Sequence, residues 1–267
     1  MDKRPIGVFD SGIGGITAVK KLREVLPNED ILYLGDTLRA PYGSRPLAEI
    51  IQFASEEAAF LAKLDVKAMI IACNTICFSS HEIIQGQYDI PVYDVIGPAA
   101  EAAVAQSKSK RIGVIATPAT IKSGAYEAAI KKVAPDAEVF STACPRFVPL
   151  VESGRTSPED AEVFTAASEY LSSFDGTEID TLVLGCTHYP LLSEVIGQIM
   201  GPGVALINSG AEVIGRVAEE LRDNDALNPD GGTAVYYVTG DTDIFTATAS
   251  KFLGLDLGES VKQATLG

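Results

Sequence analysis

The chain is poor in basic residues. Its 267 residues include 21 Lys and Arg against 36 Asp and Glu, a formal net charge of -15 at pH 7. Proteins that bind nucleic acid mainly through its phosphate backbone carry basic faces. The charge therefore argues against nucleic acid as a primary ligand, although it leaves room for a local positive pocket that binds an acidic metabolite.

Long apolar runs are also absent. No stretch approaches the roughly 20 apolar residues that a membrane-spanning helix needs. The opening Met1–Pro5 leads straight into a strand-like segment, without an apolar signal region. We expect a cytoplasmic protein with no membrane partner. Its four cysteines, Cys73, Cys77, Cys144 and Cys186, are then expected to be reduced.

What the chain does contain is a regular alternation of strand-like and helix-like segments. Short apolar runs at 6–9, 31–34 and 69–73 alternate with helix-like segments near 17–26 and 46–64. This βα alternation predicts an α/β fold with parallel sheets and helices on both faces.

The pattern then restarts in the second half of the chain. Residues 112–115 resemble 6–9, and residues 181–186 resemble the strand that ends at Cys73. Thr117 follows its strand at nearly the place that Asp10 has in the first half. We expect two similar domains, the first built from residues 1–97 plus 209–267 and the second from 98–208.

Two Cys-polar-polar tripeptides carry the chemistry. Cys73-Asn74-Thr75 follows one buried strand, and Cys186-Thr187-His188 follows its counterpart. Ligands bind at the carboxyl ends of strands in open α/β sheets, and a thiol at a helix N-terminus has a lowered pKa. Two thiols that face one substrate could take a proton from one side of a carbon and return a proton to the other. That is the chemistry of a racemase, whereas a buried cysteine that only packs does not need polar neighbours.

The segment Asp10–Gly15, DSGIGG, resembles a nucleotide-binding loop but departs from it. Thr17 stands where the third small residue of the dinucleotide fingerprint belongs, and Asp10 would repel a pyrophosphate. The glycines can instead let backbone N–H groups approach a small ligand, with Asp10 as base partner or ammonium ligand. The alternative is a tight turn that only packs a helix on the sheet.

Several other polar residues admit two interpretations. His188 could be the acid–base partner of Cys186, and Glu152 could orient His188 or simply be solvated. A Cys₃His zinc site from Cys73, Cys77, Cys186 and His188 has unusual spacing, so no metal is expected. The loop Pro41-Tyr42-Gly43-Ser44 could offer backbone donors to a carboxylate or be an ordinary loop. We expect His81 on the surface, Cys77 in packing and Cys144 in a structural role.

Taken together, these segments resemble the aspartate/glutamate racemase family. The matching stretches span most of the chain in order and are listed here: 9–15, 41–43, 72–75, 144–152 and 184–190. The resemblance implies two Rossmann-like or flavodoxin-like α/β domains with mainly parallel sheets, related by pseudo-symmetry, with the active site in the cleft between them. It also implies a homodimer.

The family resemblance further implies racemisation of L-glutamate to D-glutamate for peptidoglycan, with two bases and no cofactor. Cys73 would act on D-glutamate with help from Asp10, and Cys186 on L-glutamate with help from His188 and Glu152. The expected substrate-binding residues are Asp10, Ser11, Pro41, Tyr42, Gly43, Ser44, Asn74, Thr75, Thr117, Thr187 and His188.

Two departures from the family pattern and three alternatives remain. Ile76-Cys77-Phe78 is bulkier than the small residues expected there, and Arg146 replaces an apolar residue. The enzyme alternative is a racemase of aspartate or another acidic amino acid. A second alternative is a two-lobed binding protein for acidic amino acids, in which paired thiols would be superfluous. A third is a nucleotide-binding oxidoreductase.

Overall fold

The computed structural model describes residues 1–267, and it contains two compact units. Unit 1 comprises Met1–Val95 with Val213–Gly267, and unit 2 comprises Ile96–Glu212. The chain enters unit 2 at the start of helix α4 (Ile96–Gln106) and returns to unit 1 inside helix α10 (Ser209–Asp223).

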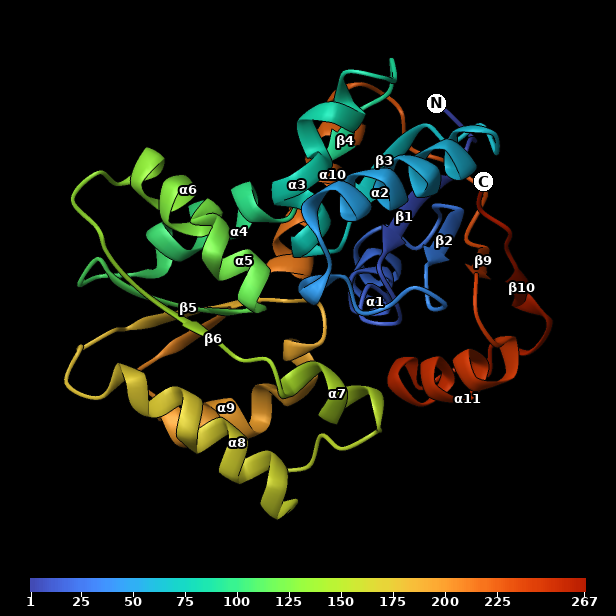
Figure 1. Cartoon of the computed structure of the whole chain (residues 1–267). Helices are drawn as coiled ribbons and strands as arrows, with labels where there is room; N and C mark the ends of the chain where they lie inside the picture. Colours follow the sequence, from blue (N-terminus) through green and yellow to red (C-terminus); the bar gives the residue numbers. More distant parts are fainter. The chain divides into compact units, whose positions relative to one another are not determined.

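Unit 1 is built on a parallel sheet of six strands with the order β10-β9-β2-β1-β3-β4 (Figure 1). Its strands are β1 (Ile6–Asp10), β2 (Ile31–Gly35), β3 (Ala68–Ile71), β4 (Val92–Tyr93), β9 (Ala234–Val238) and β10 (Val261–Gln263). Its helices are α1 (Ile16–Val25), η1 (Tyr42–Ser44), α2 (Leu47–Ala62), α3 (Asn74–Gln85), α11 (Thr242–Leu253) and η4 (Gly258–Ser260), with most of α10.

Unit 2 is built on a parallel sheet of four strands with the order β6-β5-β7-β8. Its strands are β5 (Arg111–Ala116), β6 (Glu138–Ala143), β7 (Thr181–Gly185) and β8 (Ala205–Asn208). Its helices, with α4, are α5 (Pro118–Ser123), α6 (Ala125–Val133), α7 (Phe147–Glu152), α8 (Ala161–Leu171), η2 (Ser172–Phe174), η3 (Tyr189–Leu192) and α9 (Ser193–Met200).

The two sheets repeat one arrangement. The order β2-β1-β3-β4 in unit 1 corresponds strand by strand to β6-β5-β7-β8 in unit 2. The predicted α/β class with two mainly parallel sheets is confirmed, and so is the internal repeat. Unit 1 adds β9 and β10 beyond β2, so that a strand from near the end of the chain pairs with β2.

The central strands are apolar on both faces because helices cover both faces of each sheet. Every residue of β1 and of β7 is buried. Gly7 in β1 faces helix α2: a Cβ there would lie 3.1 Å from Leu61 Cδ1. A small residue in the strand thus lets α2 pack close to the sheet.

Two further findings concern the surface and interior. None of the helices combines the length and the apolar character that a membrane span needs.

A cavity of about 370 Å³ in unit 2 is lined by Leu171, Phe174, Ile179, Met200 and Val204 among others. Ile179 and Val204 precede β7 and β8, so the cavity lies at the amino ends of these strands, at the other end of the sheet from Cys186.

Candidate active site

In unit 1, two of the expected catalytic residues lie at one edge of the sheet. Asp10 is the last residue of β1, and Cys73 follows the neighbouring parallel strand β3 by two residues. Asp10 is 0% exposed and Cys73 is 6% exposed. Because β1 and β3 run in the same direction, their carboxyl ends bring both side chains to the same side of unit 1.

The glycine-rich segment after β1 holds Asp10 in place. Asp10 Oδ1 accepts a hydrogen bond from Gly12 N at 3.0 Å, and the Tyr33 hydroxyl donates to Gly12 O at 2.6 Å. A Cβ at Gly15 would lie 2.6 Å from Asp10 Cβ, closer than real Cβ atoms approach. Glycine at 15 is therefore required by the tight return of the chain past the carboxylate.

The Cys73 thiol lies at the start of helix α3. Cys73 is the N-cap residue, with extended backbone, and Asn74 and Thr75 form the buried first turn. Its Sγ lies 3.5 Å from Ser11 Oγ. The positive end of the helix dipole favours negative charge at this place, which suits a sulfur that must exist as a thiolate in part of a catalytic cycle.

The loop after β2 carries the remaining expected binding residues of unit 1. Tyr42 is buried at 1% exposure, while Pro41 and Ser44 are exposed and Gly43 is partly exposed. The Ala40–Pro41 peptide bond is cis. The Tyr42 side chain points into unit 1, so the loop presents its backbone rather than the phenol ring.

Unit 2 contains a cysteine–histidine–carboxylate series. Cys186 follows β7, and its Sγ lies 3.8 Å from His188 Nδ1, while His188 Nε2 lies 3.2 Å from Glu152 Oε1 at the end of α7. A proton on Nε2 donates to the Glu152 carboxylate, which leaves Nδ1 of a neutral imidazole to accept from the thiol. His188 is 4% exposed, so its ring is fixed by these contacts rather than by solvent.

The surroundings of Cys186 differ from the sequence prediction in one respect. Cys186 does not begin an α-helix: Thr187 and His188 intervene, and the short 3₁₀ helix η3 begins at Tyr189. Pro190 stands in the first turn of η3, and a proline is compatible with the first turn of a helix because its missing N–H is not needed there. The imidazole, rather than a helix dipole, is therefore the close partner of this sulfur.

The two threonines of unit 2 that are expected to bind substrate have different settings. Thr187 is 4% exposed beside Cys186. Thr117 is the N-cap residue of α5, and its Oγ1 accepts from Thr120 N at 3.3 Å. The Thr117 hydroxyl thus caps a helix at the carboxyl end of β5, and its role as a substrate ligand remains a prediction.

The other two cysteines are neutral thiols in the interior. Burial raises the pKa of the Cys77 thiol well above its usual range, and the nearby charge of Asp94 adds to the effect. Cys77 Sγ donates to Ile71 O at 3.2 Å. Burial likewise raises the pKa of Cys144. These environments suit packing rather than proton transfer.

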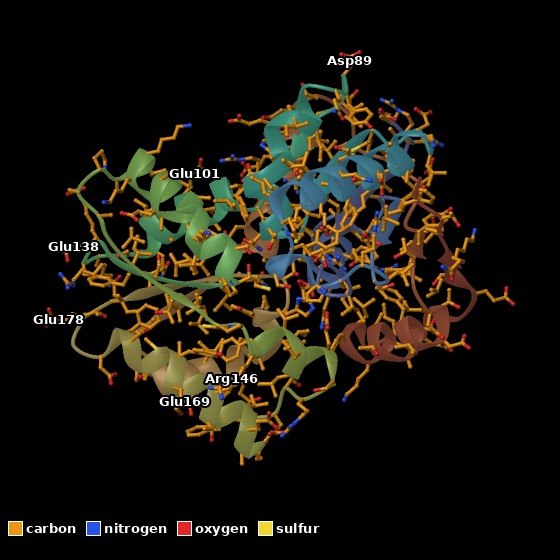
Figure 2. All side chains as sticks on the ribbon, viewed as in Figure 1. Asp89, Glu101, Glu138, Arg146, Glu169 and Glu178 are labelled. Carbon is orange, nitrogen blue, oxygen red and sulfur yellow. The ribbon has the colours of Figure 1, made fainter.

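One residue lies elsewhere than the sequence suggested, and one departure from the family pattern has a partner within unit 2. His81 is not a surface residue: it is partly buried in the middle of α3, with Nε2 2.8 Å from Val92 O, because α3 packs this face against β4. Arg146 points toward Glu169 of α8 and forms an ion pair with it (Figure 2). Its Nε also bonds the Tyr170 hydroxyl at 3.2 Å, so Arg146 links α7 to α8 within unit 2.

Sequence reasoning missed a buried polar group behind the 41–44 loop. Asp36 after β2 and Glu57 of α2 flank the Tyr42 hydroxyl, and the partly buried Arg39 bonds Asp36. A signal was present, because Glu57 lies three residues after Ala54 and four before Leu61, on the apolar stripe of α2. No three His, Cys, Asp or Glu side chains are grouped so as to hold a metal ion.

Comparison with known proteins identifies the family. The Asp/Glu/Hydantoin racemase family model matches residues 14–217. Over 260 residues, 97% of each chain, the protein is 45% identical to glutamate racemase 2 of Caldanaerobacter subterraneus subsp. tengcongensis. The chain therefore belongs to the Asp/Glu/Hydantoin racemase family.

Solved structures agree with this assignment. The fold matches glutamate racemase from Francisella tularensis, crystallised in complex with D-glutamate, with a TM-score of 0.91 and 41% identity over 99% of this chain and 98% of that one. It also matches a glutamate racemase isoform from Bacillus anthracis with a TM-score of 0.95 and 35% identity over 100% and 99%.

Proposed function

We propose that the protein is a cofactor-independent glutamate racemase that converts L-glutamate to D-glutamate. The observation that carries the proposal is the presence of one buried thiol at the carboxyl end of the equivalent strand in each unit, each beside its own polar partner. Near-identical lengths and 45% identity to a named glutamate racemase support glutamate as the substrate.

The proposed reaction uses the thiols as a matched acid and base. With L-glutamate, the Cys186 thiolate removes the Cα proton and the Cys73 thiol delivers a proton to the opposite face of the same carbon. Each turnover converts one thiolate to a thiol and the other thiol to a thiolate, so no net proton is gained. The reverse reaction from D-glutamate begins with the Cys73 thiolate.

The neighbours of each sulfur assist these transfers. His188 Nδ1 accepts the Cys186 thiol proton, and the Glu152 carboxylate stabilises the imidazolium that forms. In unit 1 we assign the assisting role to Asp10. The Cα proton of glutamate is weakly acidic, so aimed hydrogen-bond donors must stabilise the carbanion-like charge.

The substrate's polar groups need further ligands. We propose that its carboxylates and ammonium are bound by Ser11, Tyr42, Gly43, Asn74, Thr75 and Thr187, together with Asp10 and His188. Pro41, Ser44 and Thr117 complete the proposed set. The backbone N–H groups at the start of α3 and in the 41–44 loop are suited to carboxylates.

The proposal is tested by circular dichroism of purified protein with L-glutamate and, separately, with L-aspartate in D₂O, with no cofactor added. Loss of rotation with glutamate, together with deuterium at Cα, is the expected result. Loss with aspartate alone would keep the mechanism and change the substrate. No change with either would favour a two-lobed binding protein.

The cellular role is a separate part of the proposal. We propose that the enzyme works in the cytoplasm as a homodimer and supplies D-glutamate for peptidoglycan biosynthesis. Expression should restore growth of a bacterium that requires D-glutamate. Light scattering should give twice the 28.2 kDa mass of one chain, and a mass of one chain at micromolar concentration would contradict the dimer.

A further inference from the structure

The hydroxyl of Tyr42 lies between two carboxyl groups. It contacts Asp36 Oδ2 at short hydrogen-bond distance, and it lies 2.9 Å from Glu57 Oε1. Tyr42 is 1% exposed, and Asp36 and Glu57 are both 0% exposed. All three oxygens are therefore shielded from solvent.

A proton count shows that one of the two carboxyls is protonated. A tyrosine hydroxyl has a single proton and can donate one hydrogen bond, whereas an ionised carboxylate can only accept. Tyr42 can satisfy both contacts only if it donates to one carboxylate and accepts from the O–H of a carboxylic acid. The arrangement thus needs a second proton, on Asp36 or on Glu57.

The partners of Asp36 mark it as the ionised member. Arg39 Nε donates to Asp36 Oδ2 at 2.5 Å, so a guanidinium balances its charge. Thr239 Oγ1 donates to Asp36 Oδ1 at 2.7 Å. A carboxylate with a cation and two further donors around it has its charge and its acceptor capacity satisfied even when it is buried.

Glu57 has the opposite environment. No Lys, Arg or His forms an ion pair with it, and its Oε2 makes no hydrogen bond. A buried charge without a partner is strongly disfavoured, so such a group takes up a proton instead. Burial raises the pKa of Glu57 well above its usual range, and the charge of Asp36 raises it further.

We propose that Glu57 is a protonated carboxylic acid at neutral pH and acts as a positioning residue of the active site, donating its proton to Tyr42 and so fixing the Tyr42-Gly43 backbone. The effect on catalysis rests on the proposed function, because that backbone is assigned there to the substrate carboxylate. The Tyr42 hydroxyl is occupied by the two carboxyls and is not a substrate ligand.

Arg39 and Phe53 complete the support of the loop. The Arg39 guanidinium lies over the Phe53 ring at 3.9 Å, and the Tyr42 ring packs on Phe53 with centroids 5.5 Å apart. Arg45 Nε donates to Arg39 O at 2.9 Å. Helix α2 thus holds the loop through the Phe53 ring, on which the Tyr42 ring and the Arg39 guanidinium pack, as well as through Glu57.

The protonation state is tested by infrared spectroscopy of the wild-type protein at pH 7. The C=O stretch of a protonated carboxylic acid is expected, and it should disappear in Glu57→Gln. Glu82→Gln, an exposed change on α3, is the matched control and should keep the band. A wild-type spectrum without this band would overturn the proposal, and so would a band that survives in a folded Glu57→Gln protein. This test does not depend on activity, so it separates the proton assignment from the proposed racemase function.

The positioning role is tested by steady-state kinetics with glutamate. Glu57→Gln keeps a donor toward Tyr42, so its KM should stay within about threefold of wild type. Glu57→Leu loses the donor, and its KM should rise ~10-fold with a much smaller change in kcat. An equal loss of kcat in both variants at unchanged KM would contradict positioning.

A pH profile gives a second kinetic readout. The charged and titratable groups around Glu57 are Asp36, Arg39, Tyr42 and Asp10, with Tyr33 on β2 also in its field. In the wild type, KM should rise at alkaline pH as Glu57 begins to ionise, whereas Glu57→Gln should not show this rise. The same alkaline rise in both proteins would assign it to another group.

Discussion

Four cysteines in one reduced chain divide into two kinds according to their immediate neighbours. Cys77 and Cys144 lie among apolar groups, and burial raises the pKa of both. Cys73 lies at a helix N-terminus beside Ser11 Oγ, and Cys186 lies beside an imidazole. Cys77 and Cys144 bond backbone groups, whereas the second kind combines burial with a hydroxyl or imidazole side chain, as a thiol that gains and loses a proton requires.

Replacement of either proposed base should stop racemisation. We expect Cys73→Ala and Cys186→Ala each to lower kcat by roughly 10³-fold or more, because a positioned acid or base contributes about 10²–10⁴-fold and each direction needs both. The measurement is loss of rotation of L-glutamate, with far-ultraviolet dichroism to check folding. Cys144→Ala is the matched control and should retain activity; near-normal turnover in either base variant would remove the two-base assignment.

At this scale the sequence predicted what depends on strand ends and failed where packing decides. The places of Cys73, Cys186, Asp10 and His188 at strand ends could be predicted because polar residues follow apolar strands, while their roles stay a prediction. Glu57 could not be assigned, because its partners Asp36 and Tyr42 come from a different element. His81 was misplaced since its polar neighbours in sequence do not reveal that α3 turns this face toward β4.

Among the elements, the return of the chain at Gly15 is a sterically restricted position near the proposed site. A Cβ there meets Asp10 Cβ at 2.6 Å and the Tyr33 ring at 3.0 Å. We expect Gly15→Ala to displace Asp10 and lower kcat/KM by ~10-fold or more, since small misplacements of catalytic groups are costly. Steady-state kinetics checks this expectation.

Gly215 in α10 provides the matched control for this substitution. It is exposed, and a Cβ at this position would meet no atom within 4 Å. Gly215→Ala should stabilise the protein by about 0.5–1 kcal/mol through helix propensity and leave kcat/KM unchanged. Equal kinetic effects of the two substitutions would show that Asp10 is not held by this turn.

Asp180 connects the start of β7 to the turn before β5. Burial alone would raise its pKa, but donors in the turn overcome this: Ser107 Oγ and the backbone N–H groups of Lys108 and Ser109 lower the pKa to about 2. A carboxylate with a depressed pKa stabilises the fold above its usual pKa near 3.8, and this stabilisation is lost as pH falls from about 4 to about 2.

The Asp180→Asn variant should therefore lose stability at neutral pH but not in acid. Because the carboxylate is partly exposed to solvent, we expect about 1 kcal/mol at pH 7, less than the full pKa shift implies. Urea unfolding at pH 7 and pH 3 measures it, and the difference between variant and wild type should shrink at pH 3. A constant difference at both pH values would exclude the ionised carboxylate as its cause.

The order of elements was more predictable than their ends or their caps. Alternating apolar runs revealed both sheets and their repeat, because buried parallel strands must be apolar on both faces. Strand β4 comprises only Val92–Tyr93, although Val95 is apolar too, and Cys186 is followed by a 3₁₀ turn rather than by an α-helix. Such ends depend on hydrogen bonds and on proline placement, which periodicity does not report.

For the molecule as a whole, unit 1 depends on a buried ion pair that joins distant parts of the sequence. Lys67 Nζ lies 2.6 Å from Glu29 Oε2, with both side chains at most 2% exposed. The same ammonium donates to Asp2 O and Ala226 O at 2.8 and 2.7 Å, and Glu29 Oε1 accepts from Asn228 N. One cation thus connects the two sequence segments of unit 1.

Removal of one partner of this pair should be costly. Lys67→Met leaves Glu29 buried without its cation and frees two backbone carbonyls, so we expect a loss of about 3–5 kcal/mol of unfolding free energy. Chemical denaturation checks this value. The surface pair Lys110–Asp136 is the control, and Lys110→Met should cost no more than about 1 kcal/mol. Equal losses would mean that burial does not strengthen the Lys67 pair.

Strand β9 also has a consequence for the order in which the chain is made. It pairs with β2, yet its first residue, Ala234, is synthesised 139 residues after Val95. At about 5–20 residues per second, roughly 7–28 s pass between the two, and unit 2 emerges in full during that time. Until then the nascent first segment has an unpaired edge along β2, which is a template for wrong pairing. Because unit 2 is inserted between the two segments of unit 1, the β2 edge must be protected while the chain is still being synthesised.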